Sequence, residues 1–342
     1  MMRELYVSIQ AELEKIDFEA IWPGFAPIEF ILIDDEIICF ENGEKPKGSE
    51  FFGNTAMYYE GRLVATWNVS DACRADISGL AANIVHEMFH GFQKLEGESR
   101  HADEFAIFAY PDNLAAYRIK SAEYRALARA YENADPAALA DFIALRRARA
   151  EALGDVILDE YKCETTEGLA EYAGLEALRQ LSPEKFALRV EKHLGKLKNP
   201  GENLFSVRLM TYYSGSILCL VLQKLGIDFL HNLTETRTLF ELFANDDPIT
   251  ADFNKYYTDK KSKFDDLLSK PTKIIDKNLL VMGYNPMGMW QMGDQIFAHF
   301  ICLGKGDETD SKDCEIIQSP MILNINPANN REVISVILES LQ

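Results

Sequence analysis

The segment A-A-N-I-V-H-E-M-F-H-G-F, residues 81–92, carries the pattern H-E-x-x-H within a stretch of helical composition. On a helix, residues four positions apart lie on one face about one turn apart, so His86 and His90 can bind the same Zn²⁺. Glu87 then lies beside the metal without having to bind it, where a general base for a water molecule is needed. The apolar neighbours leave little room for a solvated face, so the segment predicts a metal site.

A catalytic zinc site needs a third protein ligand and an open position. The run E-T-T-E-G-L-A-E-Y, residues 164–172, offers the best candidates downstream. Glu164, Glu167 and Glu171 fall on one face of a helix, and three aligned carboxylates repel one another unless a cation or a histidine offsets them. An exposed acidic helix face is the alternative interpretation of the same residues.

The part of this run from residue 167 to 172, E-G-L-A-E-Y, closely resembles the E-G-[FL]-A-x-[YW] segment of the gluzincin metallopeptidases, above all the large zinc aminopeptidases. The resemblance implies that Glu167 is the third zinc ligand. Thermolysin-like gluzincins also place an acidic residue four positions after this ligand, where it holds a zinc-bound histidine, and Glu171 occupies that position. Such a carboxylate fixes the tautomer of the imidazole and raises its basicity.

A third segment, T-Y-Y-S-G-S-I-L at residues 211–218, is similar to the Y-x-x-G-x-x-[IVL] stretch of the same aminopeptidases. In that family the tyrosine donates a hydrogen bond to the oxyanion of the tetrahedral intermediate. Tyr212, three residues before Gly215, is the match, and Tyr213 stays open as the alternative. An aromatic pair that only packs at the start of a helix is the structural alternative.

The resemblance covers residues 86–215 and departs from the family in two ways. Between His90 and Glu167 the chain runs for 77 positions, whereas roughly twenty are usual. The G-x-M-E-N segment of the exopeptidases is also missing, and residues 53–60 stand in its place without reproducing it. The resemblance therefore implies a gluzincin catalytic scaffold and leaves endopeptidase and aminopeptidase activity equally open.

The sequence pattern around these residues predicts helices and strands that together form an α+β fold. Helical spacing of apolar residues dominates from residue 77 to about 268, with a stop and a new start at residues 133–136. Short β-branched and aromatic runs predict strands on both sides of this helical region. The expected strands are residues 28–33, 37–40 and 62–69 before it, and 279–282, 295–303 and 321–325 after it.

Three regions follow from this pattern. Residues 1–75 are expected to form a small N-terminal lobe whose edge strand, at residues 63–69, lies along the substrate. Residues 76–268 are expected to form a mainly helical, zincin-like catalytic body with a helical insertion at about 100–160, a hairpin over or beside the cleft. Residues 269–342 are expected to form a C-terminal β-rich region. Its strands are separated by a turn at residues 285–286 and a polar loop at residues 304–313.

The composition of the chain limits which partners the protein is expected to bind. The chain has 342 residues and a formal net charge of −19, so it repels phosphate backbones, and we expect no nucleic-acid partner. No apolar segment approaches the roughly 20 residues that span a bilayer. Residues 1–20 predict an amphipathic helix instead of a signal peptide. With six scattered cysteines and no C-x-x-C pair, a cytoplasmic protein without a membrane partner is expected.

The sequence thus predicts a zinc-dependent metallopeptidase with one Zn²⁺ per chain and a peptide or protein as substrate. In this hypothesis His86, His90 and Glu167 hold the metal, and Glu87 and Tyr212 act on the substrate. The alternative hypothesis is a catalytically weak or inactive protein on a peptidase scaffold, acting as a peptide-binding or regulatory module. The oligomeric state is open. The other four histidines show no ligand spacing and are expected to be structural: His101, His193, His231 and His299.

Overall fold

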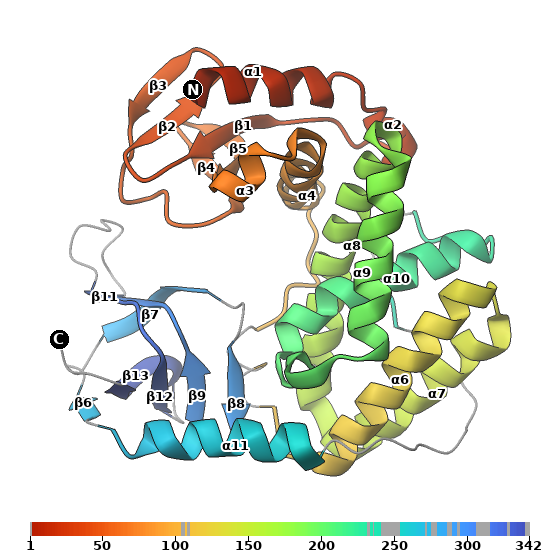
Figure 1. Ribbon diagram of the computed structural model, residues 1–342, viewed down its shortest axis with the longest axis vertical. Coiled ribbons are helices and arrows are strands. Elements are labelled where there is room, and N and C mark those ends of the chain that lie inside the picture. Colours follow the sequence, from red (N-terminus) through yellow and green to blue (C-terminus); the bar gives the residue numbers. More distant parts are fainter. Residues whose placement is uncertain are drawn as a thin grey trace. The chain divides into compact units, whose positions relative to one another are not determined.

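The computed structural model has helices and two separate sheets, so the predicted α+β class is confirmed (Figure 1). Its contacts divide the chain into two compact units. Unit 1 comprises residues 1–100, 164–195 and 212–239, and unit 2 comprises residues 101–163, 196–211 and 240–342. The structure describes residues 2–103, 107, 110–230, 233–234, 236–240, 254–270, 272–274, 279–285, 289–292, 295–305, 315–326 and 329–338.

Unit 1 contains a five-stranded sheet in the order β3-β2-β1-β5-β4. β1 and β5 pair in parallel, and the other neighbours are antiparallel. One face buries a cluster of aliphatic side chains with Phe51, which supplies most of the favourable free energy of such a sheet. The strands are β1 (Glu29–Ile33), β2 (Ile37–Phe40), β3 (Gly43–Pro46), β4 (Thr55–Tyr59) and β5 (Arg62–Asn68).

The edge strands of this sheet are β3 and β4, so the prediction that residues 63–69 form the edge is wrong. β5 lies between β1 and β4 and pairs with both. The reason is the two-residue turn of Glu60 and Gly61, whose φ angles of 47° and 78° are both positive. Such a turn joins antiparallel strands tightly, and β4 therefore folds back along β5 and covers its open side.

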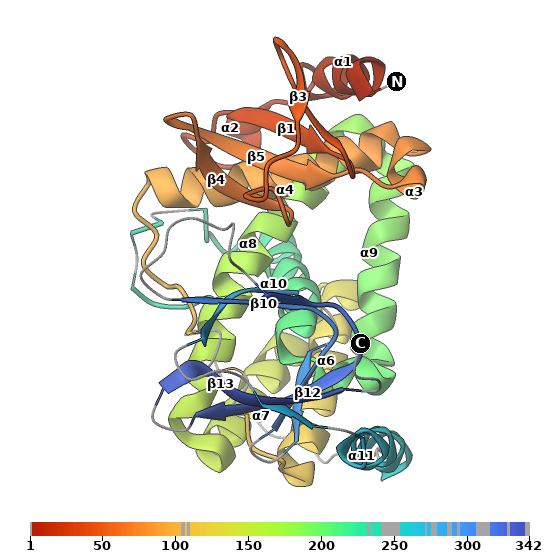
Figure 2. The ribbon, with the colours of Figure 1, turned by 90° about the vertical axis from the view of Figure 1, so that its left-hand side faces the viewer.

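Helices of unit 1 pack beside this sheet. The predicted N-terminal helix is two helices, because the Asp17 side chain accepts a hydrogen bond from the Ala20 amide and starts a second one. α4 packs against β5, β4 and β1 (Figure 2). α1 also contacts α4. The helices are α1 (Met2–Leu13), α2 (Phe18–Ile21), α3 (Asp71–Arg74), α4 (Ile77–Leu95) and the unit 1 residues of α8 (Ile157–Leu181), α9 (Pro183–Lys198) and α10 (Val207–Lys224).

Unit 2 contains the helical hairpin that the sequence predicts within residues 100–160. α6 (Leu114–Asn133) and α7 (Pro136–Leu153) pack along each other. Ala134 ends α6 in a left-handed conformation with φ 49°, and Asp135 caps α7, whose first residue is proline. The predicted stop and new start are confirmed at this turn.

The second sheet also belongs to unit 2 and has eight strands, in the order β11-β10-β7-β13-β12-β9-β8, with β6 paired to β13. The single strand predicted at 295–303 is wrong, because the chain reverses after residue 298 and gives β9 and β10, which pair with different strands. Gly304 belongs to β10, whereas Pro286 and residues 306–313 of the predicted turn and loop lie outside the described residues.

The remaining elements complete unit 2. Among the described residues, no helix is long and apolar enough to cross a membrane. The boundaries of the three regions expected from the sequence, at residues 75 and 268, stay predictions. These elements are η1 (Gly154–Val156), η2 (Gly201–Phe205), α11 (Asn254–Leu268), β6 (Thr272–Ile274), β7 (Leu279–Tyr284), β8 (Trp290–Met292), β9 (Gln295–Ala298), β10 (Ile301–Lys305), β11 (Glu315–Ile317), β12 (Met321–Asn326) and β13 (Asn329–Leu338).

Candidate metal centre

Helix α4 carries the two histidines of the H-E-x-x-H pattern. Its N-terminus is capped by Asp76, whose side chain accepts a hydrogen bond from the Gly79 amide at 3.0 Å. Most of the helix is buried, including His86, which is 6 % exposed. Buried imidazoles need polar partners, because an unpaired polar group in an apolar interior costs about 1–3 kcal/mol. The partners of these two rings therefore decide what the site can do.

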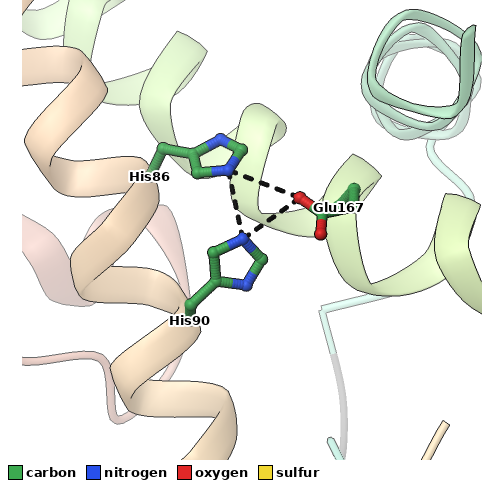
Figure 3. Close-up of side chains that lie close together, drawn as sticks. All are labelled: His86, His90 and Glu167. Atoms are coloured by element: carbon green, nitrogen blue, oxygen red, sulfur yellow. Dashed lines mark hydrogen bonds and ion pairs between the residues drawn. The ribbon is translucent and has the colours of Figure 1, made fainter. Parts of the chain in front are cut away.

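Helix α8 brings Glu167 to the histidines. Glu167 Oε2 lies 3.2 Å from His90 Nε2 and 3.6 Å from His86 Nε2, and the two Nε2 atoms are 3.1 Å apart. Figure 3 shows both rings and the carboxylate pointing toward one another. Ligands at Zn–N and Zn–O distances of about 2.0–2.2 Å in a tetrahedron are separated by about 3.3–3.6 Å. The separation of 3.6 Å falls within this range, and those of 3.1 and 3.2 Å lie 0.1–0.2 Å below it, so the three atoms are close to the spacing of three corners of a zinc tetrahedron.

The outer nitrogens of both rings fix the tautomers. His86 Nδ1 lies 3.1 Å from a carboxylate oxygen of Glu171. His90 Nδ1 lies 2.8 Å from Gln93 Oε1, and the Gln93 amide nitrogen donates to the Thr166 carbonyl at 3.0 Å, which fixes the orientation of the amide. Both outer partners can only accept, so both Nδ1 atoms carry hydrogens. The lone pairs of the neutral rings then lie on the inner Nε2 atoms.

The inner atoms therefore need a positive charge between them. Three acceptor positions, two Nε2 atoms and one carboxylate oxygen, face one another within 4.8 Å. Burial lowers the pKa of His86, but hydrogen bonds to the carboxylates of Glu167 and Glu171 outweigh this effect and raise the pKa to about 10. Burial also opposes ionisation of Glu171, yet the hydrogen bond that His86 donates lowers its pKa to about 2. The donor set suits a proton or a divalent metal ion, and its nitrogen and oxygen atoms are ligands that zinc prefers.

The three glutamates of α8 have different partners. Glu167 meets the two histidines, and Glu171 meets the outer nitrogen of His86. Glu164 instead accepts a hydrogen bond from the Ser214 hydroxyl on α10, and it is 1 % exposed. Only Glu167 belongs to the group that could hold a metal ion among the described residues. The exposed acidic face that was the alternative interpretation is wrong, because these side chains are largely buried.

The two residues expected to act on the substrate lie close to this group. Glu87 is 7 % exposed and near enough to His86 for its charge to raise the pKa of that ring. The Tyr212 ring is stacked on the His86 ring, with centroids 5.7 Å apart and planes at 3°. Tyr213 points to a different neighbour, His193, at 5.0 Å between centroids. Of the two tyrosines, Tyr212 is the one beside a predicted ligand.

Two residues of the site were missed by the sequence analysis. Gln93 is 2 % exposed and holds His90; its position three residues after His90, one turn further on the same helix, is the signal that could have found it. His193 was expected to be a structural histidine, but its Nε2 lies 3.4 Å from Glu171 Oε1. No local spacing indicates this contact, because α9 and α8 meet only in the folded chain.

Comparisons with protein-family models, with curated proteins and with solved structures gave no match to this chain.

Proposed function

We propose that the protein is a zinc-dependent metallopeptidase of the gluzincin type. The observation that carries the proposal is the convergence of His86 Nε2, His90 Nε2 and Glu167 Oε2, with both imidazoles held in the tautomer that a metal ligand requires. The H-E-x-x-H pattern, the E-G-L-A-E-Y segment and the tyrosine segment support it. A Zn²⁺ ion held by these three residues would act as a Lewis acid and would lower the pKa of a bound water toward neutrality.

The residues of the chain have distinct roles in this reaction. The Glu87 carboxylate accepts a proton from the attacking water and delivers it to the nitrogen of the departing amine. The Tyr212 hydroxyl donates a hydrogen bond to the carbonyl oxygen as negative charge develops on it. Glu171 and Gln93 keep the two imidazoles oriented throughout the cycle.

The sheet of unit 1 supports a peptide as substrate. β4 is an edge strand and packs against α4, the helix that carries the histidines. The free side of an edge strand can pair with an extended peptide through main-chain hydrogen bonds. Lys94 of α4 donates to the Ala56 carbonyl of β4 at 3.2 Å, which ties this strand to the helix. An extended peptide along β4 would thus run beside the proposed metal site.

The first experiment measures zinc per chain in protein purified without a chelator or a metal-affinity column. We expect about one zinc in the wild type, loss of zinc in Glu167→Ala, and retention in Glu164→Ala, because Glu164 contacts Ser214 instead of the histidines. Zinc kept by Glu167→Ala but lost from Glu164→Ala would contradict the assignment of the third ligand.

The second experiment measures hydrolysis of a mixed library of fluorogenic peptides. We expect zinc-dependent cleavage by the wild type and a loss of about 10²–10⁴-fold in Glu87→Gln with zinc content unchanged, because this variant lacks only the general base. Bound zinc with no cleavage of any peptide would refute the peptidase and favour the peptide-binding alternative.

A further inference from the structure

His193 lies in a contact that joins the metal group to a third helix. It belongs to α9 and is 3 % exposed. Glu171 uses one carboxylate oxygen for His86 Nδ1, at 3.1 Å, and its other oxygen lies 3.4 Å from His193 Nε2. One carboxylate is thus placed between two imidazoles, of which only the first belongs to the metal group.

Helix α9 is fixed to α4 along the face that carries His193. Lys185, Arg189 and His193 are spaced four residues apart and form one stripe on this helix. Lys185 Nζ pairs with Asp76 Oδ1 at 2.5 Å, and Arg189 donates to the Asn83 side chain at 2.9 Å. Both partners lie at or near the N-terminal half of α4. The stripe therefore sets the position of His193 relative to the helix of the histidines.

The other ring nitrogen of His193 faces the helix that carries Tyr212. Its Nδ1 lies 3.3 Å from the Ser216 oxygen, and the hydroxyl hydrogen of Ser216 is donated to the Tyr212 carbonyl at 2.7 Å. The Tyr213 ring packs on the His193 ring. His193 consequently contacts both the carboxylate that orients His86 and the turn of α10 that places Tyr212 over His86.

We propose that His193 is a positioning residue for the metal site, acting through Glu171 on His86; this rests on the proposed function. A carboxylate with a neighbour at one oxygen can rotate about its side-chain bonds, whereas one with a neighbour at each oxygen has fewer orientations open to it. Glu171 is the only partner of the outer nitrogen of His86 that the described residues provide at hydrogen-bond distance. Holding Glu171 in place therefore keeps His86 Nε2 directed toward His90 Nε2 and Glu167 Oε2, where a metal ion would bind.

The environment suits a neutral donor at this position. Burial lowers the pKa of His193 to about 4, against the opposing charge of Glu171. A neutral imidazole 3.4 Å from Glu171 Oε1 limits the positions open to that oxygen and leaves the negative charge of Glu171 available to His86. Lysine or arginine in its place would neutralise that charge and weaken the basicity of the ligand.

Two amide variants that differ by one methylene test the proposal. The amide of His193→Gln can reach the place of Nε2 and contact Glu171, while the shorter amide of His193→Asn can reach only the place of Nδ1 and contact Ser216. We expect His193→Asn to weaken zinc binding about 10–100-fold, measured by competition with a chromogenic chelator, and His193→Gln to stay within about threefold of the wild type. The visible spectrum of the Co²⁺-loaded protein should change in His193→Asn and be restored in His193→Gln.

Val190→Ala is the matched control, because Val190 is a buried residue of the same helix, 4 % exposed. It should lower the melting temperature without changing zinc affinity or the cobalt spectrum. Equal zinc affinity in the wild type, His193→Asn and His193→Gln would overturn the proposal, and so would an equal loss in both variants. A wild-type protein that binds neither zinc nor cobalt would instead remove the proposed function, and the role of His193 with it.

Discussion

At the scale of single residues, the site depends on which atoms of each side chain are already engaged. His86 and His90 each use Nδ1 for an outer partner, a carboxylate in one case and an amide in the other. An amide carries no charge, so Gln93 orients His90 without the increase in basicity that Glu171 gives to His86. The two imidazoles are therefore chemically unequal, although they have equivalent positions in the H-E-x-x-H pattern.

The roles of the two neighbouring tyrosines can be separated at this scale. Tyr212 is stacked on His86, and Tyr213 packs on His193. We expect Tyr212→Phe to lower kcat about 100-fold or more with little change in KM or zinc content, because it removes one donor to the developing oxyanion. Tyr213→Phe serves as the control and should keep kcat within a few-fold. Steady-state kinetics on one fluorogenic peptide decide the assignment, and an unaffected kcat in Tyr212→Phe would refute it.

At the scale of elements, the site requires a close approach of α4 and α8. Gly174 lies two turns after Glu167, and a Cβ atom added to it would come within 2.9 Å of the Ala82 carbonyl oxygen and 3.5 Å of His86 Cβ. Backbone cannot move aside as a flexible side chain does, so a larger residue here has to push the helices apart. The glycine thereby sets how near Glu167 comes to the histidines.

Gly174→Ala should lower the free energy of unfolding by about 1–3 kcal/mol, the usual cost of overpacking, and weaken zinc binding as well. Gly195→Ala is the control: this glycine is exposed on α9, and an added Cβ meets nothing within 4 Å. Alanine there should stabilise the helix by up to about 1 kcal/mol and leave zinc affinity unchanged. Urea unfolding and zinc titration of both variants test this, and tight zinc binding by Gly174→Ala would show that the helix spacing is not critical.

At the scale of the whole molecule, unit 2 buries charged side chains as well as a hydrophobic core. The interior of unit 2 contains a network of charged side chains from α6, α7 and α8, each at most 1 % exposed. Glu160 lies 2.8 Å from Arg149 and 3.0 Å from Lys120. Glu123 lies 2.6 Å from Arg146 and also contacts Arg149 at 2.8 Å. Three cations and two carboxylates are thus buried together, and each buried charge is stabilised by its neighbours of opposite sign.

Because of this network, we expect the stability of unit 2 to decrease at acidic pH. Burial would raise the pKa of Glu160, but Arg149 and Lys120 lower it below its ordinary value of 4.5. A carboxyl group with a depressed folded-state pKa contributes stability that is complete above its unfolded pKa and is lost as the pH falls toward the folded one. We therefore expect the protection of α6 and α7 against hydrogen exchange to decrease progressively below about pH 4.5.

Glu160→Gln provides the comparison for this prediction. It should cost about 3–5 kcal/mol at neutral pH, because Arg149 and Lys120 lose a buried counter-charge. Its exchange rates in α6 and α7 should vary less with pH below 4.5 than those of the wild type, since the titrating group is gone. The same acid dependence in the variant would assign the effect to another carboxyl group.

The sequence by itself determined the features that depend on neighbouring residues. The stop and restart at Ala134 and Asp135 follow from local backbone preferences, and so do the helix of His86 and His90 and most strand positions. The candidate metal ligands His86 and His90 could also be predicted from the sequence, because side-chain types and a spacing of four on a helix are properties of a short segment.

Only the tertiary structure decided how distant segments meet. It assigned Glu167, and not Glu164, to the histidines, found β4 at the sheet edge, and placed His193 against Glu171. All these contacts join segments that other parts of the chain separate, and their free energy comes from packing of whole elements. A helical repeat brings several residues to one face, but the neighbouring helix selects which of them it touches.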